Sequence, residues 1–266
     1  MKIAIIGTGN LGKSIAKGLI TTNAITSLYL TKRNLNTIKE FEGYKNVYLT
    51  SNNSEAIENS DIIILAVQPE HLEVILDGIQ PLLKENHIII STITGFLIAK
   101  IEGIIGSDNF IVRAMPNTAI AVGKSMTCLC GNTKGLERIK VAEAIFNRLG
   151  TSIVIPEFQM QAATVVCASG IAFWMRMIRA TTQAAIQLGF DAKEAQELAM
   201  HTCDGAANLL ITNGNHPEQE IDKVTTPKGC TIEGLNEMEH QGLSSSLIQG
   251  MVTSYNKINA IKIEQL

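Results

Sequence analysis

The sequence lacks a charge excess, a cluster of metal ligands and an uninterrupted hydrophobic run. Its 22 Lys and Arg residues against 25 Asp and Glu give a formal net charge of -3, so nothing favours binding to nucleic acid or to an anionic membrane surface. The most apolar segment runs from Val165 to Leu188, but Arg176 and Arg179 interrupt it. We interpret it as a buried or interface helix rather than a membrane span. These absences predict a protein that acts on a small molecule.

Cysteine and histidine are also few, with five residues of each scattered along the chain. The cysteines are Cys128, Cys130, Cys167, Cys203 and Cys230. Because no second pair or clustered histidine accompanies Cys128 and Cys130, we expect reduced thiols and no metal site. The first residues, Met1 to Gly7, are typical of a strand and lack the features of a signal peptide, which predicts a cytoplasmic protein.

Up to residue 155, short β-branched runs alternate with helical stretches. The predicted strands are Lys2–Ile6, Leu28–Thr31, Val47–Leu49, Ile62–Ala66, Ile88–Ser91, Phe110–Arg113 and Ser152–Ile155. This alternation is typical of parallel strands joined by crossover helices. It predicts a doubly wound α/β domain of the Rossmann type over residues 1–155. Ser125–Leu129 is predicted as an additional edge strand, and Leu136–Leu149 as one amphipathic helix.

From residue 156 to 266 the pattern becomes helical, which predicts an all-α domain. The predicted helices are Phe158–Val166, Gly170–Leu188, Ala192–Leu210, Pro217–Val224, Thr231–Gln241 and Leu243–Ile263. Gly189 is a suitable C-cap for the first of the two long helices, and Asp191 is a suitable N-cap for the second. We expect these two helices to form a hairpin. Apolar residues occupy several faces of these helices. We therefore predict a homodimer, or a higher homo-oligomer, built through the C-terminal helices.

A glycine-rich string, Gly7-Thr8-Gly9-Asn10-Leu11-Gly12, follows the first strand and precedes a helix. In this context Gly7 allows a tight turn, Gly9 lets a pyrophosphate approach the backbone, and Gly12 lets the helix pack on the strand. The string predicts a dinucleotide site that includes Asn10 and Leu11. The alternative is a merely tight turn between strand and helix.

The second strand ends Leu30-Thr31-Lys32-Arg33-Asn34, without the acidic residue that binds the ribose hydroxyls of NAD. Thr31 can donate to a 2′-phosphate, and Lys32 or Arg33 can neutralise it. We therefore predict NADP as the cofactor, with NADPH preferred over NADH. Alternatively, the two cations are solvated loop charges.

Two further turns follow strands of the same sheet, Ala66-Val67-Gln68-Pro69 and Met115-Pro116-Asn117. Ligands of open α/β sheets bind at the carboxyl ends of the strands. Backbone groups of Ala66, Val67 and Pro69, and of the second turn, are predicted to meet the nicotinamide ribose and carboxamide. The alternative is a pair of ordinary prolines that end strands.

A late loop, Thr225 to Leu235, has the composition of an anion site. Pro227 should stop the preceding helix, and Gly229 allows a backbone conformation forbidden to other residues. Thr231 can open a new helix whose free N–H groups attract a carboxylate or phosphate. Because the glycine string already serves a nucleotide, this loop predicts a second ligand.

Taken together, these motifs resemble those of pyrroline-5-carboxylate reductases. The resemblance is carried by Gly7–Gly12, Ala66–Pro69, Arg113–Thr118, Gln187–Gly189, Gly205–Ala207 and Val224–Leu235, in this order and spacing. It implies the reduction of Δ1-pyrroline-5-carboxylate to L-proline with NAD(P)H, the last step of proline biosynthesis. It also implies a substrate site completed across a dimer interface.

The resemblance assigns roles to several residues. The backbone of Gly229, Cys230 and Thr231 would hold the substrate carboxylate, and the Thr231 hydroxyl would bond the ring nitrogen as the catalytic group. A plain N-cap is the alternative for Thr231. The sheet edge at Met115 would face the substrate. Asn53 matches a position that contacts the adenosine phosphate, although it could equally be an N-cap.

The chain departs from the family pattern twice. Val67-Gln68-Pro69-Glu70 stands where Val-Lys-Pro-Gln is usual, and Cys167–Phe173 stands where Ser-Gly-Ser-Gly-Pro-Ala-Tyr is usual. The second departure keeps open a non-catalytic NADP-binding regulatory protein. Another alternative, a β-hydroxyacid-type dehydrogenase, predicts a lysine base in the long helix Gly170–Leu188, which contains none.

Overall fold

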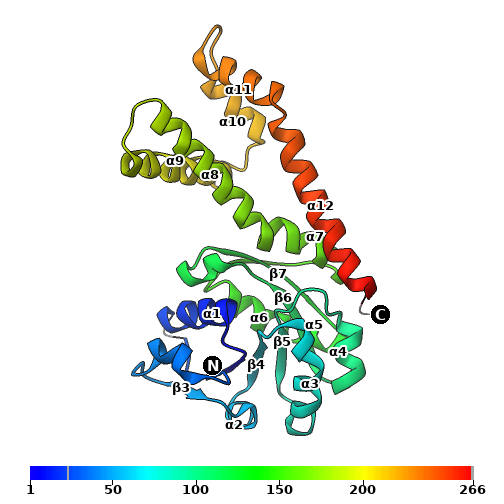
Figure 1. Ribbon diagram of the computed structural model, residues 1–266. Helices are drawn as coiled ribbons and strands as arrows, with labels where there is room; N and C mark the ends of the chain where they lie inside the picture. Colours follow the sequence, from blue (N-terminus) through cyan, green and yellow to red (C-terminus); the bar gives the residue numbers. More distant parts are fainter. Residues whose placement is uncertain (23, 265–266) are drawn as a thin grey trace. The chain divides into compact units, whose positions relative to one another are not determined.

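The computed structural model describes residues 1–22 and 24–264, and the chain divides into two compact units (Figure 1). The first unit comprises Met1–Ser169 together with the end of the last helix from Tyr255, and the second comprises Gly170–Ser254. The domain boundary predicted after residue 155 falls earlier along the chain than the end of the first compact unit.

The first unit is built on an eight-stranded sheet. Its strands are β1 (Lys2–Ile6), β2 (Ser27–Thr31), β3 (Val47–Thr50), β4 (Ile62–Leu65), β5 (Ile88–Ser91), β6 (Phe110–Met115), β7 (Ser125–Gly131) and β8 (Gly150–Val154). They lie in the order β3-β2-β1-β4-β5-β6-β7-β8, and neighbours are parallel except β6 and β7. The chain winds outward from β1 in both directions, which confirms the predicted doubly wound fold.

Helices cover both faces of this sheet (Figure 1). They are α1 (Asn10–Thr21), α2 (Asn53–Glu58), α3 (Pro69–Ile79), α4 (Ile98–Ile105), α5 (Thr133–Glu137), α6 (Ile139–Phe146) and α7 (Met160–Ala163). Short 3-10 segments occur at Leu35–Phe41, Gln80–Leu82, Thr118–Val122 and Glu157–Gln159, and a π-helical segment at Thr164–Ser169.

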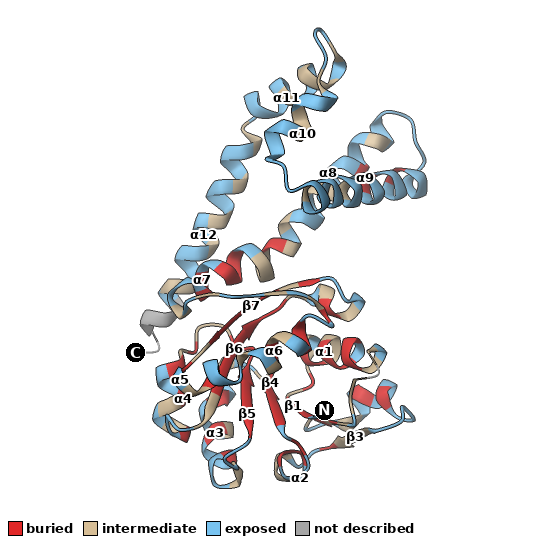
Figure 2. Ribbon diagram, turned by 180° about the vertical axis from the view of Figure 1, so that it is seen from behind, coloured by how far each residue is buried: buried red, intermediate tan, exposed pale blue. Residues whose placement is uncertain are grey.

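The core of the first unit consists of two apolar layers, one on each face of the sheet. Along β1, Ile3 and Ile5 join the layer that contains α1 and α6, whereas Ala4 and Ile6 join the layer that contains α3 and α4. This alternation follows from the two-residue period of a strand. Because both faces are covered, the central strands β1, β4, β5 and β6 are buried almost throughout (Figure 2), and ligands reach only the sheet's edges and ends.

Two local predictions for this unit are wrong. The strand predicted as an edge is β7, which lies inside the sheet between β6 and β8 and runs antiparallel to β6. The single helix predicted over Leu136–Leu149 is broken at Arg138, which has φ -113° and ψ 8°, into α5 and α6. At the break, the Arg138 guanidinium lies 5.2 Å from the ring centroid of Phe110 on β6, which is a cation–π contact.

The second unit is helical, as predicted. It contains α8 (Gly170–Gln187), α9 (Ala192–Asn213), α10 (Pro217–Val224), α11 (Cys230–His240) and the first part of α12 (Leu243–Glu264). Asp191 caps α9 by accepting hydrogen bonds from the N–H groups of Lys193 and Glu194. The continuous helical stretch Glu157–Gln187 has the length and composition that could cross a membrane, a test that core helices of soluble proteins also pass.

Most residues of the second unit are exposed in the single chain (Figure 2). Among the described residues of α8 and α9, only Gly170, Thr182, Ala195 and Ala199 are buried. Large apolar side chains remain in contact with solvent, including Trp174 at 57% exposure and Ile211 at 79%. A surface of this kind is typical of an interface between protein chains.

Candidate functional site

A cleft of about 630 Å³ lies in the first unit, at the carboxyl ends of β1, β2, β3 and β4. Most of the predicted cofactor-binding residues line it. They are Gly7, Gly9, Thr31, Lys32, Arg33, Asn53, Ala66 and Val67. The cleft therefore brings together four segments that are separate in sequence, as expected for a dinucleotide site at the switch point of a doubly wound sheet.

The glycine turn has the geometry that its sequence predicts. Gly7 has a φ of +92°, and a Cβ at this position would collide with the side chain of Val67 and the backbone of Ala66. At Gly12 a Cβ would lie 2.5 Å from the carbonyl oxygen of Gly7, so only glycine lets α1 approach β1 this closely. Gly9, in contrast, has open space beside it.

That open space lies at the start of α1, where Gly9 is the N-cap residue. No side chain of the described residues caps the helix, so its first N–H groups are available to a ligand. Helix N-termini of this kind bind phosphate groups. Asn10, Leu11 and Gly12 form the first turn of α1 and are not among the residues that line the cleft.

The charge of the cleft is positive on the side of β2. Lys32 and Arg33 both line it, and none of the described lining residues is Asp or Glu. Neither cation forms an ion pair with another described residue. The hydroxyl oxygen of the buried Thr31 accepts a hydrogen bond from the Gly7 N–H at 3.3 Å, which ties the end of β2 to the glycine turn. The arrangement can hold a phosphate next to a ribose.

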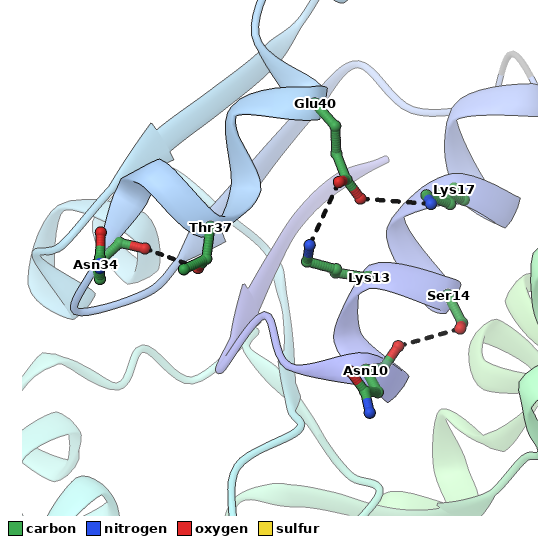
Figure 3. A network of polar contacts seen from close by, with 7 residues as sticks. All are labelled: Asn10, Lys13, Ser14, Lys17, Asn34, Thr37 and Glu40. Atoms are coloured by element: carbon green, nitrogen blue, oxygen red, sulfur yellow. Dashed lines mark hydrogen bonds and ion pairs between the residues drawn. The ribbon is translucent and has the colours of Figure 1, made fainter.

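A polar network anchors the segment that follows Arg33 against α1 (Figure 3). Glu40 accepts from Lys13 and Lys17, each at 3.3 Å. Partial burial raises the pKa of the Glu40 carboxyl, but the hydrogen bonds from the two lysines outweigh it, so the pKa is lowered overall. Asn34 caps this segment by accepting from the Asn36 N–H at 3.1 Å. The network occupies the two lysines of α1 and leaves the cations of the cleft free.

Asn53 is the first residue of α2 and lines the cleft. The N-cap of this helix is Asn52, whose side chain accepts from the Ser54 N–H at 3.0 Å. The alternative interpretation of Asn53 as an N-cap is therefore wrong, and its amide remains available to a ligand.

The two proline turns are placed differently. Pro69 begins α3 without lining the cleft, but Ala66 and Val67 before it do line it. Met115 is buried at the end of β6, and neither it nor Pro116 lines the cleft. The Asn117 amide is engaged by backbone groups: Oδ1 accepts from the Ala119 N–H at 2.9 Å and Nδ2 donates to the Cys167 carbonyl at 3.0 Å.

Several residues that line the cleft were not predicted from the sequence. They are Ile6, Thr8, Asn34, Ser51, Gln68, His71, Val74 and Ile75. His71, Val74 and Ile75 share one face of α3, with the helical spacing of three and four residues. This spacing, counted from the turn at Ala66, could have indicated them.

The late loop lies in the second unit, and one detail of its prediction is wrong. Gly229 has an ordinary φ of -77°, and it is Lys228 that adopts a positive φ of 59°. The Gly229 N–H donates to the Thr226 carbonyl at 2.9 Å, which closes a tight turn around Pro227. Glycine is required at 229 because a Cβ there would collide with Thr226.

Helix α11 begins at Cys230, directly after this turn. Its N-cap is Gly229, so the alternative that Thr231 serves as the N-cap is wrong. Because Gly229 has no side chain, the N–H groups of Cys230, Thr231 and Ile232 lack a side-chain cap. The half-buried Thr231 places a hydroxyl in the same first turn. This start of a helix can bind a small carboxylate.

Comparisons with known proteins match both units. Residues 157–261 match the family model described as pyrroline-5-carboxylate reductase dimerisation, and residues 2–95 match the one described as NADP oxidoreductase, coenzyme F420-dependent. Pyrroline-5-carboxylate reductase 1 of Dictyostelium discoideum is 47% identical, with 96% of this chain covered. The chain spans about half of that relative, 49% of its length.

Other relatives match over nearly their whole length. Pyrroline-5-carboxylate reductase 2 of Dictyostelium discoideum is 41% identical, with 96% of this chain and 91% of that protein covered. The crystal structure of the Plasmodium falciparum pyrroline carboxylate reductase with NADP bound has a TM-score of 0.88 at 26% identity, covering 98% of both chains. The Coxiella burnetii pyrroline-5-carboxylate reductase has a TM-score of 0.88 at 28% identity, covering 97% of both chains.

Proposed function

This chain belongs to the pyrroline-5-carboxylate reductase family, and we propose that it reduces Δ1-pyrroline-5-carboxylate to L-proline with NADPH, in preference to NADH. The observation that supports the proposal is that two separate places in the chain have a geometry that suits an anion. One is the cleft at the glycine turn, which suits a dinucleotide, and the other is the start of α11, which suits a small carboxylate.

The preference for NADPH is inferred from the charges of the cleft. Lys32 and Arg33 would neutralise a 2′-phosphate, and no described lining residue offers a carboxylate to the ribose hydroxyls of NAD. Asn53 adds an uncharged amide to the same part of the cleft. An unphosphorylated ribose would leave the two cations without a counter-charge.

The chemistry requires little of the protein beyond positioning. The bound nicotinamide supplies a hydride, which must reach the imine carbon from about 3–3.5 Å. A cyclic imine protonated on nitrogen is already an electrophile, so a hydroxyl near the nitrogen suffices and no strongly acidic group is needed. Backbone N–H groups at Gly229–Thr231 would hold the carboxylate, and the Thr231 hydroxyl would orient the ring nitrogen.

The proposal includes a homodimer, or a higher homo-oligomer, built through the C-terminal helices. It is supported by the match of residues 157–261 to a dimerisation model and by the exposed apolar side chains of α8 and α9. We further propose a cytoplasmic protein whose partner is a small-molecule substrate, with no nucleic acid and no membrane. Light scattering of the purified protein tests the oligomer, since a monomer would contradict it.

The decisive experiment follows NADPH oxidation after addition of Δ1-pyrroline-5-carboxylate, with L-proline identified as the product. A dehydrogenase of the β-hydroxyacid type would instead reduce NADP with a hydroxyacid substrate. That activity is disfavoured because α8 carries Arg176 and Arg179 but no lysine base. A regulatory protein would bind NADPH without turnover of either substrate.

A further inference from the structure

Two thiols lie close together in the first unit. Cys128 on β7 and Cys167 in the π-helical segment Thr164–Ser169 have their Sγ atoms 3.8 Å apart. Both are free cysteines, Cys128 buried and Cys167 partly exposed. A disulfide bond of about 2.05 Å would require the sulfur atoms to approach by about 1.75 Å. A π-helical turn is a local irregularity of the helix and is often found at functional sites.

Each cysteine is connected to the turn that follows β6. Cys128 is the direct strand partner of Met115. The carbonyl of Cys167 accepts the hydrogen bond from the Asn117 amide at 3.0 Å. Asn117 also caps the 3-10 segment Thr118–Val122. A covalent bond between the two sulfurs would therefore constrain the Met115–Asn117 turn from both sides.

The two thiols are not equivalent. A hydrogen bond from the Cys128 thiol lowers the pKa of Cys167 to about 7, although burial acts in the opposite direction. The same hydrogen bond, together with burial, raises the pKa of Cys128. Burial also raises the pKa of the nearby Cys130 to about 11. Since the thiolate is the nucleophilic form, Cys167 is the member of the cluster that reacts first with an oxidant.

We propose that Cys128 and Cys167 form a reversible disulfide when a peroxide oxidises the protein, and that this bond restrains the Met115–Asn117 turn. The Cys167 thiolate attacks one peroxide oxygen, which breaks the O–O bond and gives a sulfenic acid and, after protonation, water. The Cys128 sulfur then attacks the sulfenic sulfur. The S–S bond forms, the S–O bond breaks, and the thiol proton leaves with hydroxide as a second water.

In the net step, two thiols lose two electrons and two protons, and hydrogen peroxide becomes two waters. A dithiol reductant returns both cysteines to thiols by exchange. Cys230, at the start of α11, is a free and exposed thiol, so it is the competing site of oxidation that the test must separate from this pair.

Thiol counting and peptide mapping test the disulfide on the unaltered chain. The protein is treated with hydrogen peroxide, alkylated, digested and analysed by mass spectrometry. The disulfide should remove two of the five free thiols, and one linked pair of peptides should contain Cys128 and Cys167. Dithiothreitol should restore all five. The proposal is overturned if both cysteines remain alkylated, or if Cys167 is linked only to another chain.

The effect on the turn is tested through reductase activity and thus rests on the proposed function. Peroxide should cause a loss of activity that dithiothreitol restores, in the unaltered chain and in the control Cys203→Ser. Cys167→Ser should keep its activity under the same treatment. An equal loss of activity in Cys167→Ser would refute the coupling to the turn. It would indicate that oxidation of Cys230 causes the loss instead. If no reductase activity is found at all, the peptide map still decides the disulfide.

Discussion

Replacing Arg33 with alanine is the sharpest test of cofactor choice. The Arg33 guanidinium is exposed, lines the cleft beside Lys32, and forms no ion pair with another described residue. It is therefore free to meet a 2′-phosphate, and its removal disturbs no internal contact of that kind. The substitution should therefore lower the affinity only for a ligand that carries the extra phosphate.

The magnitude follows from the exposure of the site. A hydrogen bond to a charged group contributes about 1.5–3 kcal/mol. The lower end applies here because Arg33 lies in solvent and Lys32 remains to share the phosphate charge. A loss of about 1.4 kcal/mol corresponds to about tenfold in affinity. We therefore expect Arg33→Ala to raise the Kd for NADPH about tenfold and to leave that for NADH nearly unchanged.

Fluorescence titration with both cofactors measures the effect, in low and in high salt. The matched control is Arg148→Ala, which removes an exposed arginine of the same unit that does not line the cleft. It should bind both cofactors as the unaltered chain does. Equal weakening of NADPH and NADH by Arg33→Ala would refute the assignment of the 2′-phosphate to this part of the cleft.

Three further predictions address the second ligand, the glycine turn and stability. Thr231→Ala should lower turnover sharply while the Kd for NADPH stays nearly constant, and Thr231→Ser should retain activity; unchanged turnover in the alanine variant would remove the catalytic role. Gly12→Ala should cost about 1–3 kcal/mol of unfolding free energy because its Cβ has no room, whereas Gly103→Ala, with open space on α4, should be neutral or stabilising by urea denaturation. Burial and the charge of Lys84 lower the pKa of His87, so the unfolded chain binds its proton more readily. The contribution of neutral His87 to the free energy of unfolding should be fully present above a pH of about 6.5 and should be lost as the pH falls below that value. The substitution His87→Gln should weaken this pH dependence.

The pattern of the sequence predicts the strands near β1 well but not the position of β7. Strand β4 consists of isoleucine and leucine alone, and β5 has three isoleucines before Ser91; such apolar runs are typical of fully covered parallel strands. The run Ser125–Leu129 mixes serine, threonine and cysteine. It becomes an internal strand only because β8 pairs with it, and that pairing depends on Gly150, where a Cβ would collide with the Ser125 backbone. Such a contact between distant residues leaves no local signal.

The break between α5 and α6 has a similar origin. The Asn132 side chain accepts from the N–H groups of Ile111 and Gly135, at 3.2 and 2.6 Å, and donates to the Glu102 carboxylate at 2.8 Å. One buried amide thus joins α5 to β6 and α4. The helical periodicity of Leu136–Leu149 is correct on each side of the break, but the tertiary contacts of the residues before it decide where the helix bends.

The departure from the family pattern at Gln68 and Glu70 changes the expected charge of the cofactor site. Gln68 does line the cleft, so a cation that the family pattern would supply is absent there. Glu70, however, is not among the described lining residues and lies in the first turn of α3, where the helix dipole favours a carboxylate. We therefore expect the Glu70 carboxylate to interact favourably with its own helix and not to oppose a bound phosphate. Lys32 and Arg33 remain as the cations of the cleft, so we expect the proposed cofactor preference to depend more strongly on the end of β2 than the family pattern alone would suggest.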